Sequence, residues 1–358
     1  MEYRTITTLE AFETIKPEWL RIEQLLTEIS FFSTFEYCYT WWEVYQNESE
    51  YKLWIICVYQ NADIVGIAPL MIKKQTKRFI KYASLLFLAP GDYHDFLIDP
   101  GAAVKPETIY KHIFSVIEKN KKLWDEIHLT HICHKSQLAG YLLKSNFNPC
   151  FNYLIENPYI DISKYSDFND FKDKRLPAKP IQYANRLKKL TNYSLHITTG
   201  DLIDKFAQIH IAEKNHLQSK GKLKRHSLFE NDFRKRFLEK VFLKGFALSY
   251  YLYDNNLSKI IIYNSGFIFR YMFYSLNTAF DPTYERLGVG KIIYYEIFKE
   301  NFINPRWSLF DAGTGRYPWK FEWTSDFNLL YQLHYIKPES RHLKLLRKLR
   351  KIKQALKS

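Results

Sequence analysis

The chain has 358 residues, of which 52 are basic and 38 acidic, so its formal net charge is +14. At about 150 residues per domain, this length predicts two domains. Hydrophobic residues make up 46% and charged residues 25%, values that exclude a disordered chain and a fibrous repeat, and the sequence has no apolar run long enough to predict a membrane-spanning helix.

The N-terminal segment MEYRTITTLEAFE contains acidic residues and lacks the apolar core of a secretory signal. The four cysteines show no CxxC pair and no dense spacing. Such a pattern is typical of reduced thiols, so the sequence predicts a cytoplasmic protein without structural disulfides. These cysteines are Cys38, Cys57, Cys133 and Cys150.

The first half of the chain predicts an α/β lobe over residues 1–164. Helices are expected first, at 17–29 and 35–45, and they are followed by a hairpin of β-branched and aromatic residues. The remaining elements alternate between strand and helix. In chain order the expected ranges are the hairpin 51–60 and 64–73, strand 83–89, helix 107–122, strand 125–132, helix 136–144 and strand 150–162.

Residues 165–190 are basic and interrupted by Pro177 and Pro180, which predicts a linker that ends in a helix. A second lobe is expected over 191–338, with helices at 202–220 and 230–244, a hairpin at 246–266, a strand at 269–280, a helix at 291–302 and a strand at 306–313. The order of elements repeats that of the first half, which indicates an internal duplication in pattern. A basic tail occupies 339–358.

A glycine turn precedes the helix that is expected from Lys291. In FDPTYERLGVGKIIYYEIF, a long apolar strand ends and Gly288, Val289 and Gly290 lead into the helix. Glycines let a ligand approach the backbone, and the first N–H groups of a helix favour a pyrophosphate. The alternative is a strand-to-helix turn in which the glycines only relieve crowding. The spacing fits neither a dinucleotide-binding fingerprint nor a P-loop.

About twenty residues later, SLFDAGTGRYPWKFEW places Asp311 at the end of an apolar strand. Together with the LGVG turn, the FDAGTG strand end and the aromatic-Lys pair at Trp319 and Lys320, this segment resembles the GNAT acetyltransferase superfamily. Within it, the segment is similar to the CelD-like branch associated with cellulose and envelope polysaccharide synthesis. In that branch the pair is usually Tyr-Lys, so Trp319 departs from the pattern.

The resemblance implies an α/β fold of two tandem GNAT-like lobes, each a mixed, mostly antiparallel sheet flanked by helices, in a layout shared with the Fem peptidyltransferases. It also implies acetyl-CoA or another acyl-CoA as cosubstrate, with its pyrophosphate at Gly288, Val289, Gly290 and Lys291, and no metal. One position departs from the superfamily pattern, because Glu285 stands where Gln or Arg is usual.

Acyl transfer from a thioester needs a base for the acceptor and a proton for the departing thiolate. Asp311 is the candidate base or acceptor anchor; alternatively, its carboxylate bonds the N–H groups of the AGTG turn. Lys320 is a candidate ligand for an anionic acceptor or for the CoA phosphates; the alternative is a solvated helix charge. Tyr317 is the candidate proton donor.

Five further residues are candidates for substrate binding. Residues His94 and Asp95 lie in the loop segment GDYHDF of the first lobe, which is alternatively a polar surface loop. Arg186 belongs to the basic linker helix, and Asp281 lies between a strand and a turn, where an Asx-turn is equally expected. His210 matches the histidine of a helix in the similar family.

The segment HLTHICH spaces its histidines, His128, His131 and His134, by three residues. On a strand, residues three apart point to opposite faces, so no metal site is predicted there.

The tail after Glu339 carries eight basic residues and no acidic one, with apolar residues at helical spacing from Leu345. It predicts either peripheral contact with an anionic membrane or a helix docked on the body. Nucleic acid is not expected as a partner, except for a tRNA donor.

The sequence therefore predicts an acyl-CoA-dependent N- or O-acyltransferase whose acceptor is a sugar, a polysaccharide or a lipid-linked envelope precursor, acting at the inner face of the membrane. Two alternatives stay open. One is a Fem-like transferase that takes an aminoacyl group from tRNA, and the other is a catalytically silent scaffold.

Overall fold

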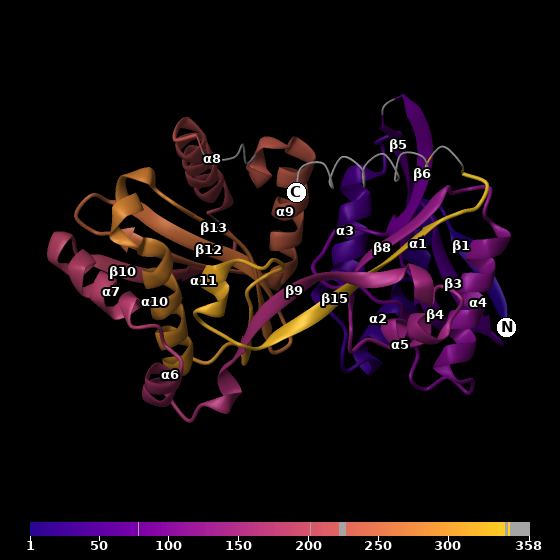
Figure 1. Ribbon diagram of the computed structural model, residues 1–358, viewed down its shortest axis with the longest axis horizontal. Coiled ribbons are helices and arrows are strands. Elements are labelled where there is room, and N and C mark those ends of the chain that lie inside the picture. The colour runs from indigo at the N-terminus through magenta and orange to yellow at the C-terminus, as the bar shows by residue number, and fades with distance from the viewer. Residues whose placement is uncertain (78, 201, 222–226, 341–342, 344–358) are drawn as a thin grey trace. The chain divides into compact units, whose positions relative to one another are not determined.

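A computed structural model describes residues 1–77, 79–200, 202–221, 227–340 and 343 (Figure 1). The chain divides into two compact units. Unit 1 comprises Met1–Ile155 together with the described residues from Leu329 onward, and unit 2 comprises Glu156–Asn328. The division lies within a strand, between residues 155 and 156, and the end of the second predicted lobe returns to unit 1.

Unit 1 begins with a strand and three helices and continues with strands that alternate with two more helices. The elements are β1 (Glu2–Ile6), α1 (Leu9–Thr14), α2 (Lys16–Leu25), α3 (Phe35–Tyr45), β2 (Tyr51–Leu53), β3 (Ile55–Gln60), β4 (Asp63–Ala68), β5 (Leu70–Lys77), β6 (Ile80–Phe87), β7 (Leu97–Ile98), α4 (Pro106–Lys119), β8 (Glu126–Cys133) and α5 (Gln137–Lys144). Two longer strands, β9 (Phe151–Asp161) and β15 (Phe327–Ile336), have residues in both units.

The predicted hairpin at 51–60 and 64–73 is confirmed, but each arm is interrupted. Its outer halves pair as β2 and β5, whereas its inner halves pair as β3 and β4 in a separate sheet of order β1-β3-β4-β7. Pro69 stands at the break, where a residue without an N–H cannot continue the ladder. The other strands of unit 1 run in the order β15-β8-β6-β5-β2. Within that order β6 and β8 are parallel.

Helix α4 covers the core of unit 1 with one apolar face. Its buried residues Ile109, Ile113, Phe114 and Ile117 recur at helical spacing and pack with residues of β3, β6 and β8. At about 25 cal/mol per Å² of apolar surface removed from water, such side chains provide most of the driving force for folding of the unit. The helix therefore has a structural role in holding the two sheets of unit 1.

In unit 2, most of the helices and strands precede β13 in the chain. Strand β13 forms the parallel pair of this unit with β14. The elements of unit 2 are α6 (Phe168–Lys174), α7 (Lys179–Leu190), β10 (Tyr193–Thr198), α8 (Ile203–Ser219), α9 (Asp232–Val241), β11 (Ala247–Asp254), β12 (Lys259–Phe269), β13 (Met272–Phe280), α10 (Val289–Ile303), β14 (Leu309–Asp311) and α11 (Pro318–Phe321). The strands of this unit run in the order β10-β11-β12-β13-β14-β9. Only the β13–β14 pair is parallel among these described strand pairs.

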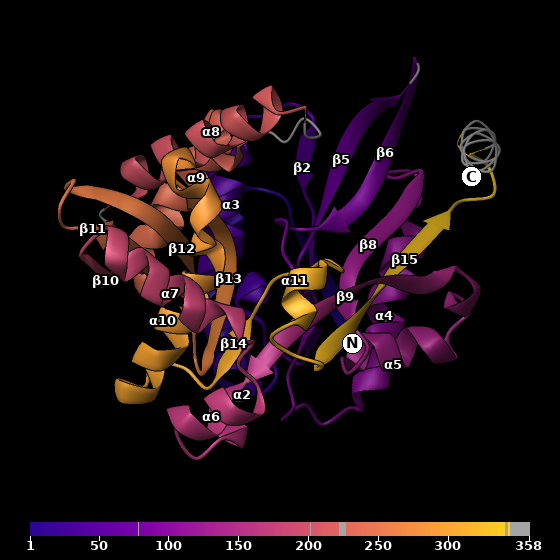
Figure 2. The ribbon, with the colours of Figure 1, turned by 60° about the vertical axis from the view of Figure 1, so that its left-hand side comes forward.

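The two faces of the unit 2 sheet carry different helices. Helices α7 and α10 pack together on one face, whereas α8 contacts β13 from the other (Figure 2). The α10 face is apolar, with Phe273, Ile262 and Phe310 among its buried residues. The expected fold class, a mixed and mostly antiparallel sheet flanked by helices, is thus confirmed.

No described helix is both long enough and apolar enough to cross a bilayer. The predicted amphipathic tail, 339–358, lies outside the described residues apart from Glu339, Ser340 and the buried Leu343.

Candidate functional site

The parallel strands β13 and β14 stay paired over a short distance only. Their register joins Met272 to Leu309, Phe273 to Phe310 and Tyr274 to Asp311, and β14 ends there. Strand β13 continues to Phe280. Over residues 275–280, no strand in the described part of the chain pairs with the edge of β13 that faces β14. The peptide groups on this edge therefore have no partner in a described strand and can bond a ligand or water, whereas those on the other edge pair with β12.

A β-bulge in the β12–β13 ladder lies at the start of the stretch 275–280. Ser265 pairs with Asn277 and Gly266 pairs with Ser275, so Leu276 is the extra residue. A side chain at Gly266 would overlap the carbonyl oxygen of Tyr274, so only glycine fits there. Because of the bulge, Tyr274 and Asn277 lie on the same face of the sheet although they are three residues apart.

Helix α10 begins just after β13, at the predicted glycine turn. Gly288 has a φ of 69°, and a Cβ built on it would lie 2.5 Å from Cδ2 of Tyr183. A Cβ on Gly290 would meet nothing within 4 Å. Lys291 N–H makes the bond to Gly288 O (2.9 Å), so the N–H groups of Val289 and Gly290 precede the first bond of the helix. Gly288 is needed by the fold, and Gly290 leaves the helix start open.

The charges around this helix start are paired. Lys291 contacts the carboxylate of Glu322. Glu285, the residue that departs from the superfamily pattern, accepts from Nε2 of His216 (3.0 Å) and also contacts Lys220. The hydrogen bonds from His216 and then Lys220 lower the pKa of Glu285 to about 2. The negative charge of Glu285 is thus balanced by residues of α8 and its C-terminus and does not stand alone before the helix.

Asp311 and Lys320 hold the same turn from its two sides. Asp311 is 1% exposed and its Oδ1 accepts from the N–H of Gly313 (2.8 Å). Lys320 is 4% exposed and its Nζ donates to the carbonyl oxygens of Gly313 (2.6 Å) and Thr314 (3.0 Å). The alternative of a solvated Lys320 is therefore wrong, because its ammonium is buried and bonded to backbone. The Asx-type bond of Asp311 is present, and it uses one carboxylate oxygen.

The other oxygen of Asp311 contacts a residue that the sequence did not suggest. Asn157 on β9 is completely buried and its Nδ2 donates to Asp311 Oδ2 (3.3 Å). The residue lies within the predicted strand 150–162, where a polar side chain among apolar ones was the available signal.

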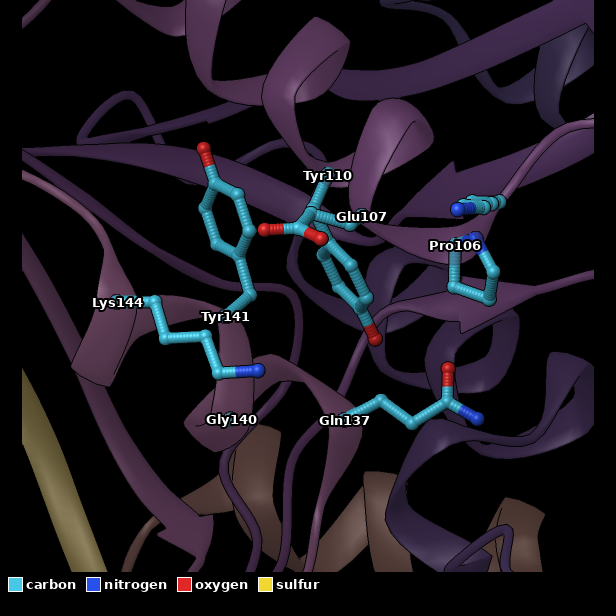
Figure 3. A pocket seen from close by; sticks show the side chains of 8 residues that line it. Pro106, Glu107, Tyr110, Gln137, Gly140, Tyr141 and Lys144 are labelled. Carbon is cyan, nitrogen blue, oxygen red and sulfur yellow. The ribbon is translucent and has the colours of Figure 1, made fainter.

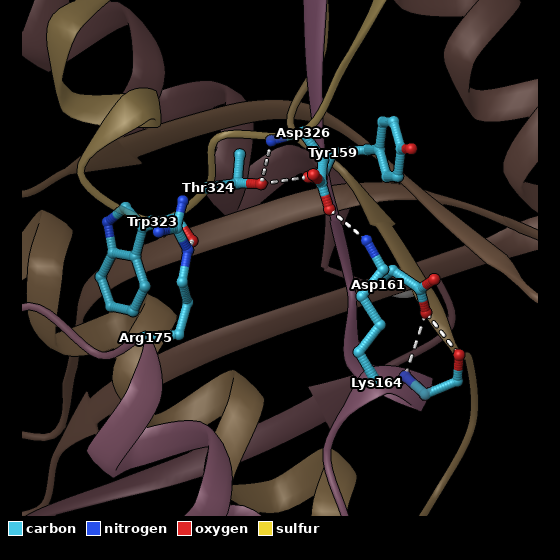
Figure 4. A network of polar contacts seen from close by, with 8 residues as sticks. Tyr159, Asp161, Lys164, Arg175, Trp323, Thr324 and Asp326 are labelled. Atoms are coloured by element: carbon cyan, nitrogen blue, oxygen red, sulfur yellow. Dashed lines mark hydrogen bonds and ion pairs between the residues drawn. The ribbon is translucent and has the colours of Figure 1, made fainter.

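The segment after α11 is fixed by bonds to β9 and to the neighbouring helices (Figure 4). Arg175 Nε donates to the carbonyl oxygen of Trp323 (2.9 Å), and Thr324 Oγ1 donates to that of Tyr159 (2.7 Å). Lys164 and Asp326 form an ion pair at 2.5 Å. These contacts fix the chain that carries Lys320, so the turn beside Asp311 is preorganised.

Tyr294 of α10 lies under the same strand region on the opposite sheet face. Burial raises its pKa to about 12, against the opposing effect of hydrogen bonds with Ser275, Thr278 and Asn264. Asn264 Nδ2 in turn donates to Ser275 Oγ (2.8 Å) and Thr278 Oγ1 (2.6 Å). These side chains are thus bonded to one another, apart from Asn264 Oδ1, which has no partner in the described structure, and the bonds fix β13 to α10.

The other predicted residues of unit 2 lie in different surroundings. Tyr317 is 46% exposed, with the Nζ of Lys320 5.3 Å from its ring centre. Asp281 caps the turn before α10 by accepting from Thr283 N–H (2.9 Å) and also pairs with Lys259 (3.0 Å). It has the structural Asx role that was the alternative for it.

His210 and Arg186 lie on helices away from the turn. His210 is buried on α8, where its Nδ1 bonds Ser227 Oγ (2.7 Å), and burial lowers its pKa to about 4. Arg186 is exposed on α7. The structure therefore brings together Asp311, Lys320 and Tyr317.

In unit 1, His94 and Asp95 are enclosed by the protein. His94 stacks on Phe87 (4.7 Å), its backbone N–H donates to His131 O (2.9 Å), and burial lowers its pKa to about 3. Burial raises the pKa of Asp95 to about 7, although its carboxylate accepts from Phe96 N–H (2.7 Å). The alternative of a polar surface loop is wrong for His94, which is only 6% exposed.

A cavity of about 380 Å³ lies between α4 and α5 of unit 1 (Figure 3). Tyr110 lines it and also contacts Asp95 through its hydroxyl (3.5 Å). The remaining lining residues are Lys105, Pro106, Glu107, Gln137, Gly140, Tyr141 and Lys144.

The histidines of β8, His128 and His131, and His134 just after the strand do not converge. His128 stacks on His334 (4.6 Å), His131 bonds its neighbour Thr130, and His134 bonds Leu329 O. No group of three or more potential metal ligands occurs among the described residues.

Comparisons with known proteins place the glycine turn and Asp311 in a recognised domain. Residues 182–321 match the family described as an acetyltransferase (GNAT) domain. This match covers β10 to α11 and supports acyltransferase activity generally, with an acyl donor and an acceptor as substrates. No curated protein matches the chain.

Several solved structures share the fold over nearly the whole chain. The crystal structure of FemX has a TM-score of 0.60 at 11% identity and covers 97% of this chain and 99% of its own. L-PGS from Bacillus licheniformis has 0.55 at 11%, covering 92% and 96%. The C-terminal domain of a putative lysylphosphatidylglycerol synthetase from Agrobacterium fabrum has 0.54 at 10%, covering 94% and 96%. At these identities the likeness concerns the fold alone.

Proposed function

We propose that the protein is an acyl-CoA-dependent N- or O-acyltransferase of the CelD-like type, with a sugar, a polysaccharide or a lipid-linked envelope precursor as acceptor. One observation carries the proposal: β13 and β14 part after Tyr274 and Asp311, and the helix that follows β13 starts at a glycine turn. The peptide groups exposed by that separation lie within the segment that matches the acetyltransferase domain.

The residues at the start of α10 fit a diphosphate. The N–H groups of Val289 and Gly290 come before the first helical bond, and the helix dipole favours an anion there. The space beside Gly290 is open where a side chain would otherwise stand. Acyl-CoA would supply the activated acyl group as a thioester.

Asp311 is proposed as the base or anchor for the acceptor. Its carboxylate is buried at the end of β14, beside the separation of the strands, and is oriented by Gly313 and Asn157. Lys320 holds the turn that comes after it. Tyr317, whose side chain is exposed beside Lys320, is proposed to donate the proton to the departing thiolate.

Titration calorimetry with acetyl-CoA tests the proposal. The wild-type chain is expected to bind acetyl-CoA, and desulfo-CoA, which keeps the diphosphate, is expected to compete with it. Absence of any binding heat for acetyl-CoA and for longer acyl-CoA would overturn the proposal.

A Fem-like aminoacyl transfer from tRNA is the second candidate, and the fold shared with FemX favours it. Filter binding to aminoacyl-tRNA separates the two. Retention of charged tRNA together with no acetyl-CoA binding would support the second candidate. A chain that binds neither donor would support a scaffold without catalysis.

For location, we propose the cytoplasm with peripheral contact at the inner face of the membrane. The support is the sequence of the tail, whose clustered basic residues favour an anionic surface at roughly 1 kcal/mol per residue. Deletion of residues 344–358 is expected to abolish co-sedimentation with phosphatidylglycerol vesicles while leaving acetyl-CoA binding unchanged. Equal sedimentation of both forms would contradict the membrane contact.

A further inference from the structure

We infer that Tyr263 and Asn277, two buried residues of unit 2 with unbonded polar atoms, form the floor of the acceptor site and bind neighbouring hydroxyl or amino groups of a sugar. The inference rests on the proposed function, because an acyltransferase must bind an acceptor beside its acyl donor. The contacts of the two residues define the site.

Both side chains are buried without hydrogen-bond partners. Tyr263 is 0% exposed and Asn277 is 9% exposed. Within the described structure, the hydroxyl of Tyr263 has no partner, and the same holds for both Oδ1 and Nδ2 of Asn277. A buried polar atom left unbonded costs about 1–3 kcal/mol, so three such atoms at one place require an explanation.

The two residues are neighbours on one face of the sheet. Tyr263 pairs with Ala279, and Ser265 pairs with Asn277, which puts Tyr263 and Asn277 on a diagonal of the β12–β13 ladder. Diagonal residues are on the order of 7–8 Å apart, a span that a ligand with two adjacent polar groups bridges by one hydrogen bond at each end.

The same face leads to Asp311. The bulge at Leu276 puts Asn277 on the side of Tyr274, and Tyr274 is paired with Asp311. A group bound at Asn277 therefore lies beside the point where the two parallel strands part. An acceptor held there is adjacent to the proposed position of the thioester, which is the proximity that acyl transfer needs.

Helix α8 covers this floor and adds a charged group. Phe206 stacks on the ring of Tyr263 at 4.3 Å. Glu213, two turns further along, is 5% exposed and contacts Lys214. Burial and the charge of Glu213 raise the pKa of Tyr263 well above its usual value, so its hydroxyl stays protonated and can donate. The floor is neutral, with a carboxylate nearby.

Two other buried side chains of this sheet, Asn264 and Asn157, each have an unbonded Oδ1 but donate through Nδ2, whereas Tyr263 and Asn277 make no side-chain hydrogen bond in the described structure. Ser249 Oγ donates to Ser265 Oγ (2.9 Å) on the same face. On the α10 face, Tyr250 accepts from Trp307 Nε1 (3.0 Å), and both polar atoms of Asn301 are used. Among these buried residues, the side chains without any bonded polar atom are therefore Tyr263 and Asn277, on the face that leads to Asp311.

The chemistry of the floor selects the ligand class. A carboxamide offers a donor and an acceptor, and a phenol hydroxyl offers both as well. Together they match a ligand with neighbouring hydroxyl or amino groups and no net negative charge. An amino sugar has both, and its ammonium would also favour the nearby carboxylate of Glu213.

The test compares unbonded residues with bonded residues of the same type. Tyr263→Phe and Asn277→Leu are the test variants, and Tyr250→Phe and Asn301→Leu are the matched controls. Each full-length variant is titrated with D-glucosamine and with D-glucose by calorimetry, in the absence and in the presence of acetyl-CoA, and its thermal unfolding is recorded.

The test variants are expected to weaken D-glucosamine binding at least tenfold and to leave Tm unchanged or raised, since they remove no hydrogen bond within the protein. The controls are expected to lower Tm and to keep wild-type sugar affinity. The inference is overturned if the wild type binds neither sugar, if the test variants bind like the wild type, or if they lower Tm as much as the controls do.

Acetyl-CoA affinity in the same samples separates this inference from the proposed function. The test variants are expected to change it by less than twofold. A wild-type chain that binds the sugar through these residues but binds no acyl-CoA would contradict the proposed function and leave the sugar site standing. If the wild-type chain binds acetyl-CoA but the test variants leave sugar affinity unchanged, the sugar site is contradicted and the proposed function stands.

Discussion

Units 1 and 2 each contain one parallel strand pair with a helix between its strands, and they differ in how the chain continues beyond the paired residues. In unit 1, β6 and β8 pair at Ser84–Glu126 and Leu85–Ile127. After β6 ends, the chain comes back to β8, where His94 forms an isolated parallel bridge with Ile132. In unit 2, β13 and β14 part after Tyr274 and Asp311 without such a bridge among the described residues.

The helices that lie between the paired strands also begin differently. Helix α4 begins with Pro106 at its first position and has no glycine there. Helix α10 begins with Gly288 as its cap and an open position at Gly290. In unit 1, the segment at His94 thus occupies the edge of β8 beyond the parallel pair. In unit 2, no described segment bridges β13 and β14 beyond their parallel pair. The comparison favours unit 2 for the proposed acyl transfer and a structural role for unit 1.

Asp311→Asn is expected to have the largest effect. If its carboxylate takes the acceptor proton, turnover falls by about 10²–10⁴-fold while acetyl-CoA affinity stays the same. The measurement is thiol release from acetyl-CoA with D-glucosamine as acceptor.

Asp254→Asn is the control for Asp311→Asn, because Asp254 is also a buried carboxylate of unit 2 and is bonded to Thr191 and Tyr284. This control is expected to lower stability and to keep the turnover of the folded fraction. Equal turnover in wild type and Asp311→Asn would remove Asp311 from the chemistry.

Gly290→Val is expected to weaken acetyl-CoA binding about tenfold or more, which corresponds to about 1.4 kcal/mol. The valine has room in the free protein, so the effect comes from the blocked ligand position. Glu107→Val changes the corresponding second position of α4 in unit 1 and is expected to leave the affinity unchanged. Calorimetry with acetyl-CoA on both variants tests this expectation. If Gly290→Val binds acetyl-CoA as tightly as Glu107→Val does, the assignment of the acyl-CoA site to unit 2 is refuted.

Gly288→Ala is expected to lower the free energy of unfolding by about 1–2 kcal/mol, because an L-residue is strained at a φ of 69°, and contact with Tyr183 adds to the loss. Gly290→Ala is helical and is expected to raise it by up to about 1 kcal/mol. Urea unfolding of both variants measures the difference. If both variants lose stability equally, Gly290 is also a structural glycine.

Glu285→Gln is expected to have the smallest effect. The pKa of Glu285 is held at about 2 in the folded chain by His216 and Lys220. The unfolded chain takes up the proton first, so the contribution of this carboxylate is present above pH 4.5 and is lost as the pH falls toward 2. The variant should flatten this acid limb in urea unfolding at stepped pH. Parallel limbs for wild type and Glu285→Gln would contradict the pairing.

Local patterns predicted most of the elements. The helix at 35–45 and the strand that ends at Phe280 match the expectation closely, because periodicity and apolar runs determine them. Strands β1, β10 and β15 were not expected. In β10 nearly every residue is half-buried, so no alternation is visible, and the return of β15 to unit 1 depends on distant pairing.

Local sequence chemistry was enough to single out Gly288, Gly290 and Asp311 as candidate site residues, and their roles stay predictions. Burial of Lys320 depends on the carbonyl groups of the turn at Gly313, which no pattern of side chains reveals. Asn277 stood within a predicted strand, but the bulge at Leu276 decides which face it occupies. Long-range register therefore limits what the sequence can show about the site.

Hydrogen exchange measured by mass spectrometry, with and without acetyl-CoA, tests the central claim most directly. The account predicts that the ligand protects the amides of 275–280 and of 289–291 and leaves those of 88–98 and 128–133 unchanged. Protection of the unit 1 segments, with none at the start of α10, would contradict it.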